Sequence, residues 1–223
     1  MFNSVNTSYY IADYSNNRVY KLSDTWEYVS FKYFREPTYI RAISNVLYII
    51  AVSYIYKTDN NLNVLKQYNI TGTRYYQGIY YNPHDTLIYI SSISANAILV
   101  FDLNLSLNDS ISTSNYDPYA IVCFDSQLYV GTSNGLVLVI ANKIIIRTFN
   151  GCLGNSGFLM YIIFDQFGYM VTTCQTPNKI YLYNSNGIYA GKNLSTASSP
   201  YYTEFDSIGR FVIVTGNHVR LYY

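Results

Sequence analysis

The chain has 223 residues, of which half are hydrophobic and 12% are charged, and its formal net charge is +1. A chain of this length buries about 70% of its unfolded surface, and the composition is too apolar and too weakly charged for a disordered protein. The near-neutral charge gives no broad basic field, so neither nucleic acid nor an anionic membrane is an expected partner.

The hydrophobic runs of the chain are short. The longest, from Val46 to Tyr56, falls well below the roughly 18 residues that a membrane helix needs, so we expect no membrane span. No cationic and apolar leader is visible at the start, so either there is no secretory signal or the chain is a mature or trimmed form.

Short apolar and aromatic runs recur along the chain at a spacing of about forty residues. Further β-branched runs precede and follow each of them. Turn sequences rich in Asn, Asp and Gly, such as those at 165–168 and 184–187, separate the runs and suit tight hairpins, because Gly and Asn accept a positive φ. No segment has the period of a helix. In chain order, the central residues of the runs are Tyr10, Tyr48, Tyr89, Tyr129, Met170 and Val212.

Four strands in each unit of about forty residues predict an all-β fold, a six-bladed β-propeller over residues 1–223 as a single domain. Six such units need about 240 residues, so we expect incomplete first and last blades. The first has only Met1 to Val5 for its innermost strand, and the last stops after its third strand. Either the N-terminal segment closes the last blade, or another molecule adds a strand to its edge at Val219 to Tyr223.

The sequence from Tyr9 to Lys21 resembles the NHL repeat, whose core reads Tyr-Val-Ala-Asp, then an Asn-rich turn, then Arg and an apolar strand. The later units are similar to NHL-type propellers of secreted invertebrate proteins. The resemblance implies that Asp13 and Arg18 form a structural pair across a hairpin, with a binding role as the alternative. NHL propellers include protein-binding, RNA-binding and lyase members, so the resemblance implies a fold rather than one function.

The residues that catalysis would need are scarce. The two histidines, His84 and His218, lie in turns that open on opposite faces of the predicted propeller, so they cannot share a metal site. No calcium loop, phosphate-binding glycine motif or Ser-His-acid set is recognisable. We therefore expect no catalytic residue, no metal, no cofactor and no enzyme, with a lyase or hydrolase as a distant alternative.

Charge is unevenly distributed along the chain. Residues 75–142 carry five aspartates and neither lysine nor arginine, whereas both flanking segments are net positive. This distribution offers RNA no broad basic face. It suits side-to-side docking of copies, and ordinary solvated loop charges are the alternative interpretation.

Of the three cysteines, Cys123 lies in a predicted innermost strand, where we expect a buried thiol. Cys152, in the loop before the fifth unit, and Cys174, at the end of its second strand, open on the same face of a propeller. A disulfide between them is therefore expected, which implies an oxidising compartment. Two unrelated thiols are the alternative.

The chain also has five Asn-x-Ser/Thr sequons, about as many as chance provides. All fall in terminal, inter-strand or outer-strand positions that tolerate a glycan. The predicted glycosylation sites are Asn6, Asn69, Asn104, Asn108 and Asn193.

Most of the 28 tyrosines are explained by their preference for β-strands. Some must remain exposed, and exposed tyrosine is typical of protein interfaces and of carbohydrate stacking. The residues that we expect at an interaction surface are Tyr75, Tyr76, Tyr201, Tyr202, Val219, Tyr222 and Tyr223.

Together these features predict a non-catalytic extracellular or secreted interaction module that associates with its own copies, as the repeating subunit of a glycosylated fibre or matrix. Glycans or other extracellular proteins are further partners. The alternative is a soluble carbohydrate- or peptide-binding propeller that uses tyrosines on one loop face.

Overall fold

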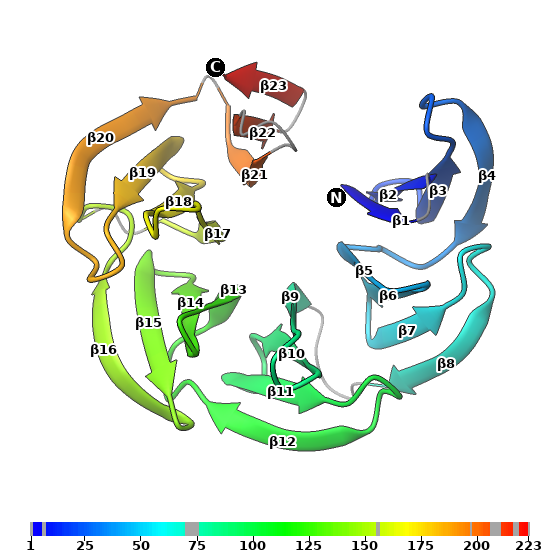
Figure 1. The fold of residues 1–223 in the computed structure, drawn as a ribbon, viewed down its shortest axis with the longest axis horizontal. Coiled ribbons are helices and arrows are strands. Elements are labelled where there is room, and N and C mark those ends of the chain that lie inside the picture. The colour runs from blue at the N-terminus through cyan, green and yellow to red at the C-terminus, as the bar shows by residue number, and fades with distance from the viewer. Residues whose placement is uncertain are drawn as a thin grey trace. The chain divides into compact units, whose positions relative to one another are not determined.

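The computed structural model consists of antiparallel β-strands in six sheets (Figure 1). It describes residues 2–5, 8–69, 76–154, 157–196, 198–205, 211–215 and 219–222, with the backbone alone at 2–5, 76–77, 204–205 and 219–222. The chain divides into two compact units, residues 1–111 and 112–223.

The N-terminal unit contains three four-stranded sheets, and in each the strands pair in chain order. Sheet 1 comprises β1 (Phe2–Val5), β2 (Ser8–Asp13), β3 (Arg18–Leu22) and β4 (Tyr28–Tyr33). Sheet 2 comprises β5 (Tyr39–Ile43), β6 (Val46–Ala51), β7 (Tyr54–Thr58) and β8 (Val64–Asn69). Sheet 3 comprises β9 (Tyr76–Asn82), β10 (Leu87–Ser92), β11 (Ala97–Phe101) and β12 (Leu107–Ser112).

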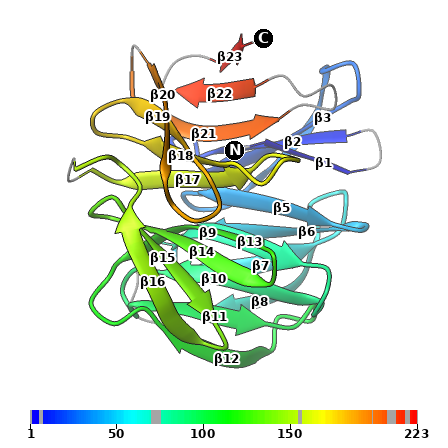
Figure 2. The same ribbon diagram turned by 60° about the vertical axis from the view of Figure 1, so that its left-hand side comes forward.

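The C-terminal unit contains two four-stranded sheets and one three-stranded sheet, which can be followed in Figure 2. Sheet 4 comprises β13 (Pro118–Phe124), β14 (Gln127–Thr132), β15 (Leu136–Ala141) and β16 (Ile144–Asn150). Sheet 5 comprises β17 (Leu159–Phe164), β18 (Met170–Cys174), β19 (Lys179–Tyr183) and β20 (Tyr189–Ser195). Sheet 6 comprises β21 (Pro200–Phe205), β22 (Phe211–Thr215) and β23 (Val219–Tyr222).

The predicted blades correspond to these sheets, with two differences. Five sheets, rather than six, have the four strands of a complete blade. The prediction that the first blade is incomplete is wrong, because Phe2–Val5 pairs with β2 and supplies its innermost strand. Since the N-terminal segment is used in this way, the fourth strand that sheet 6 lacks among the described residues does not come from β1.

Alternate side chains of a strand point to opposite faces of its sheet. Within each unit, apolar side chains on one face of a sheet pack against those on the facing side of its neighbour. Sheet 1 contributes Tyr10 and Val19 to a buried cluster with Ile40, Leu47 and Ile49 of sheet 2. Sheets 4 and 5 share a second cluster. Each aliphatic side chain buried in this way stabilises the fold by roughly 1.5–3 kcal/mol.

In four sheets the third and fourth strands are joined by a five-residue turn of one construction, which we call the outer turn. The first residue donates its backbone N–H to the carbonyl of the fifth, and its side-chain oxygen accepts a bond from the N–H of the fifth. The fourth residue has a positive φ. Short polar side chains favour such turns at the first position. The outer turns are Ser23–Glu27, Asp59–Asn63, Asp102–Ser106 and Asn184–Ile188.

A tyrosine of the second strand fastens several of these turns to the preceding sheet. The Tyr10 hydroxyl donates to the carbonyl of Asn60 at 2.8 Å, and the Tyr48 hydroxyl donates to that of Leu103 at 2.6 Å. Tyr129 makes the same contact with the carbonyl of Ser185 at 3.3 Å. We call this contact the tyrosine latch. Burial, followed by the charge of Asp102, raises the pKa of Tyr48 to about 12.

A basic side chain accompanies each latch. Lys21, which lies opposite Tyr10 in register, donates to the Asn61 side chain at 3.1 Å. Lys57, opposite Tyr48, donates to the carbonyl of Leu103 at 2.8 Å. In sheet 4 the base is Arg147, from the fourth strand. Three of the four recurring tyrosines therefore hold the outer turn of the next sheet, whereas the Tyr89 hydroxyl donates to Asp85 of its own sheet.

Candidate interaction site

The described residues contain no group of three His, Cys, Asp or Glu side chains that could hold a metal ion. His84 is exposed in the turn between β9 and β10, and His218 lies outside the described residues. No helix in the described part of the chain is long and apolar enough to cross a membrane.

Cys152 and Cys174 are joined by a disulfide in the structure, with their Cα atoms 5.9 Å apart. Both are fully buried and belong to the cluster between sheets 4 and 5. The predicted pairing is therefore present. Cys123 lies in β13 and is partly exposed rather than buried.

Asp13 and Arg18 face each other in register on β2 and β3, but their contacts lead away from each other. The Asp13 carboxylate accepts bonds from the backbone and side chain of Asn16. The Arg18 guanidinium lies 4.4 Å from the centroid of the Phe31 ring and donates to the Tyr33 hydroxyl at 3.1 Å. Both therefore contact residues of sheet 1, and their pairing stays a prediction.

Four of the predicted glycosylation sites are exposed, which glycosylation requires, and whether they are occupied stays a prediction. Asn6 lies outside the described residues. The four exposed asparagines are Asn69, Asn104, Asn108 and Asn193.

The predicted interaction residues fall into three groups. Tyr201 is exposed, and the half-buried Tyr202 packs on Tyr161 with ring centroids 4.5 Å apart. Tyr75 and Tyr223 lie outside the described residues. For Tyr76 in β9, and for Val219 and Tyr222 in β23, only the strand backbone is described.

The start of the innermost strands of the C-terminal unit carries an aromatic row. Tyr119 of β13 contacts Phe158, just before β17, with ring centroids 5.3 Å apart. The Tyr161–Tyr202 pair and the exposed Tyr201 continue the row toward β21. The row adds Tyr119 and Phe158 to the predicted surface. Sequence reasoning missed them because each looked like an ordinary strand residue.

Sheet 1 carries a larger aromatic surface, which sequence reasoning did not identify. Tyr20, Phe31 and Tyr33 contact one another in sequence across β3 and β4, with centroid separations of 5.9 and 5.3 Å. Tyr28 packs on Tyr20, and Trp26 stacks on Tyr9 at 4.4 Å. The exposed members are Trp26, Tyr28, Phe31 and Tyr33. We call these six residues the aromatic face. Alternation along β4 could have revealed Phe31 and Tyr33, whereas Tyr28 lies on the same side only because of the register shift at Leu22.

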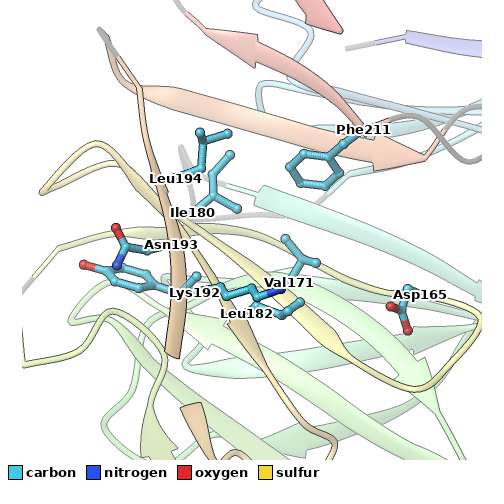
Figure 3. A pocket seen from close by; sticks show the side chains of 9 residues that line it. Asp165, Val171, Ile180, Leu182, Lys192, Asn193, Leu194 and Phe211 are labelled. Carbon is cyan, nitrogen blue, oxygen red and sulfur yellow. The ribbon is translucent and has the colours of Figure 1, made fainter. Parts of the chain in front are cut away.

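An apolar groove of about 350 Å³ lies on sheet 5. Its floor is formed by Val171 and Leu182, which pair in register, and by Ile180 and Leu194, which also pair. Figure 3 shows these side chains together with Phe211 of β22. Polar groups also line it, among them Lys192, Asn193 and Asp165.

The groove shows that the sequence alignment of the repeats is shifted by one residue in sheet 5. Met170, the predicted equivalent of Tyr129, points instead into the cluster shared with sheet 4. Val171 lines the opposite side, in the groove, and is the residue that corresponds to Tyr129. Because side chains alternate, a one-residue shift moves every side chain to the other face. Sheet 5 therefore has valine where three other sheets have the latch tyrosine.

Comparison with known proteins shows the fold. No family model matches the chain, and no curated protein is similar to it. The crystal structure of the WD40 β-propeller domain of Doa1 is similar, with a TM-score of 0.82 and 10% sequence identity over 100% of this chain and 77% of that one. The likeness extends to 1337 solved chains, so it identifies a β-propeller architecture and not a family.

Proposed function

We propose that this β-propeller is a non-catalytic protein-interaction module that associates with its own copies outside the cell. The aromatic face of sheet 1 is the observation that carries the proposal. Four exposed aromatic residues on one turn and one strand form an apolar patch of the kind that marks protein interfaces, where tyrosine, tryptophan and phenylalanine are enriched. Between 36% and 65% of each of these side chains is still exposed, and a partner that covers them would remove that area from water.

Three further features support the extracellular setting of the proposal. The disulfide between Cys152 and Cys174 suits an oxidising compartment. Four sequons are exposed. The first repeat resembles the NHL repeat, and we include in the proposal an NHL-like propeller whose sixth blade has three strands. A glycosylated fibre or matrix built from such subunits is the assembly that these features favour.

The test is the molar mass of the purified chain as a function of concentration. Sedimentation equilibrium between roughly 1 and 100 µM should show a mass that rises above 25.6 kDa. Phe31→Lys with Tyr33→Lys should lower that mass, because lysine keeps the patch hydrated. The matched control is Phe167→Lys, an exposed residue in the β17–β18 turn, which should behave as the unmodified chain. A constant monomer mass contradicts the proposal.

The aromatic row of the C-terminal unit favours a second candidate function, the binding of a carbohydrate or peptide. Aromatic rings in tilted contact near the strand ends, with Phe158 and Tyr201 exposed, suit sugar faces and extended peptides. A glycan array and a peptide array probed with the chain should show ligands whose signal falls with Tyr201→Ala. Arrays without a ligand would remove this candidate.

A further inference from the structure

We infer that the outer turn of sheet 1, Ser23–Glu27, docks in the sheet 5 groove of a second copy, with Trp26 as the inserted side chain. The inference rests on the proposed self-association and names the two surfaces that carry it.

The outer turns of sheets 2 and 3 show what this kind of turn does. Their fourth residues, Leu62 and Leu105, have φ of 63° and 54° and are 0% and 1% exposed. Leu62 belongs to the cluster that contains Tyr10 and Val19 of the preceding sheet. The turn thus inserts one apolar side chain into the face of the sheet before it.

The outer turn of sheet 1 has the same construction and a larger side chain at that position. The Ser23 N–H donates to the Glu27 carbonyl at 2.9 Å, and Trp26 has φ 66°. Trp26 is nevertheless 56% exposed. Among the outer turns, those of sheets 2 and 3 already bury their leucines, and that of sheet 5 has Gly187. Among the described outer turns, therefore, sheet 1 alone presents an exposed apolar side chain at the fourth position; in sheet 5 the exposed apolar side chain is Ile188, at the fifth position.

The groove lies at the matching receptor position on sheet 5. Register places Val171, Leu182, Ile180 and Leu194 of sheet 5 where sheet 1 has Tyr10, Lys21, Val19 and Lys32. In sheet 1 the Tyr10, Lys21 and Lys32 side chains bind the outer turn of sheet 2. The groove is thus the place where an outer turn sits, and sheet 6 has three strands among the described residues and offers no such turn there.

The chemistry of the groove fits the turn of sheet 1. All four floor positions are apolar, so the groove receives an apolar side chain rather than the polar backbone that a latch holds. A hollow of about 350 Å³ is within the range of pockets that hold a small aromatic group. The turn carries two acidic residues, Asp24 and Glu27. The groove is lined by one basic residue, Lys192, and one acidic residue, Asp165. The chain itself supplies a turn of this repeated construction, which identifies a second copy as the occupant.

Trp26 is the sole tryptophan of the chain, so its fluorescence reports the proposed contact directly. As concentration rises, its emission should shift to the blue together with the rise in molar mass. Leu182 of sheet 5 corresponds to Lys21 of sheet 1. The substitution Leu182→Lys places a charge on the groove floor and should weaken association about tenfold or more. Leu65→Lys, an exposed leucine of β8, is the matched control and should leave both signals unchanged.

A mixing experiment separates the two surfaces. Trp26→Ala retains the groove, and Leu182→Lys retains the tryptophan, so each alone should stay monomeric. Their mixture should form a dimer, with a blue shift that comes only from the Leu182→Lys partner.

The outcomes distinguish the inference from the function on which it rests. A monomeric unmodified chain overturns both, and a blue-shifted monomer would show docking within one chain instead of between copies. If the unmodified chain associates and Leu182→Lys associates equally well, or if the mixture stays monomeric, the groove assignment is wrong and the proposed function stands.

Discussion

Sheets 1 and 5 use the same positions of the repeat with opposite chemistry. In sheet 1, Tyr10, Lys21 and Lys32 bind the outer turn of the next sheet. In sheet 5, the corresponding Val171, Leu182 and Leu194 line an open apolar groove. The comparison shows that the repeat determines where two sheets meet, whereas the side chains at these positions determine whether the junction is a polar latch or an apolar site.

The two units also differ in how their junctions are stabilised. A latch hydrogen bond contributes only about 1 kcal/mol, whereas the insertion of a leucine contributes two to three times as much. The junction between sheets 4 and 5 has Gly187 in place of an inserted leucine and has the disulfide in addition to its latch. The four predictions below alter these contributions one at a time.

The largest effect is expected from removal of the disulfide. Cys152→Ser with Cys174→Ser opens a loop of 22 residues and should lower the free energy of unfolding by about 3 to 4 kcal/mol. Urea unfolding followed by circular dichroism measures the change, and Cys123→Ser is the control. A change as small as that of the control would mean that the cluster between sheets 4 and 5 is sufficient without the bond.

The next effect is expected at the inserted residues. Leu62→Ala should cost about 2 to 3 kcal/mol, because a fully buried leucine leaves a cavity. Trp26→Ala, at the same position of the outer turn in sheet 1, should cost less than about 1 kcal/mol in dilute monomer, because Trp26 is mostly exposed. Urea unfolding of both variants tests the comparison; equal costs would show that the two turns are not equivalent.

The latch of sheet 2 should appear in the pH dependence of stability. The pKa of Tyr48 is raised to about 12, above the value of about 10 in the unfolded chain. The folded state therefore favours the protonated phenol. Because burial is the largest cause of the raised pKa, the preference of the folded state for the neutral phenol, about 2 kcal/mol, exceeds the contribution of the latch hydrogen bond alone; it is complete below pH 10 and is lost as the pH rises toward 12.

The variant Tyr48→Phe isolates this contribution from the other tyrosines. It should melt at a lower temperature than the unmodified chain at pH 8, and the two melting temperatures should converge between about pH 10 and 12. A difference that stays constant over this range would show that the Tyr48 hydroxyl does not titrate as the latch requires.

The smallest effects are expected from a reciprocal exchange. Lys21→Leu removes the bond to Asn61 and should cost about 0.5 kcal/mol, because the bond is exposed. Leu182→Lys should change stability by no more than about 0.5 kcal/mol, since no outer turn among the described residues meets it. Thermal melts of both variants measure these effects. A large loss for Leu182→Lys would mean that the groove floor belongs to the core.

The sequence predicted the sheets because their causes are local. Alternating β-branched and aromatic runs, separated by Asn, Asp and Gly turns, predict strands and hairpins without knowledge of the partners. The pairing of Cys152 with Cys174 was also predictable, because a propeller brings the end of a second strand and the preceding inter-blade loop to one face.

The latch, the groove and the aromatic face could not be predicted in the same way. The Tyr10 hydroxyl binds a carbonyl fifty residues away, and a carbonyl leaves no mark in a sequence. The groove depends on whether Val171 or Met170 faces sheet 6, and periodicity alone does not resolve a shift of one residue. Trp26 has the same turn position as Leu62, and only burial distinguishes the two.

The bond between Cys152 and Cys174 also changes what a single cut of the backbone does. A protease that cleaves anywhere between these residues, for example next to the exposed Leu153, leaves both fragments joined through sulfur. The nicked polypeptide would then migrate as one band without reductant and as two bands with it. Cleavage in this segment therefore severs the backbone yet releases no part of the molecule.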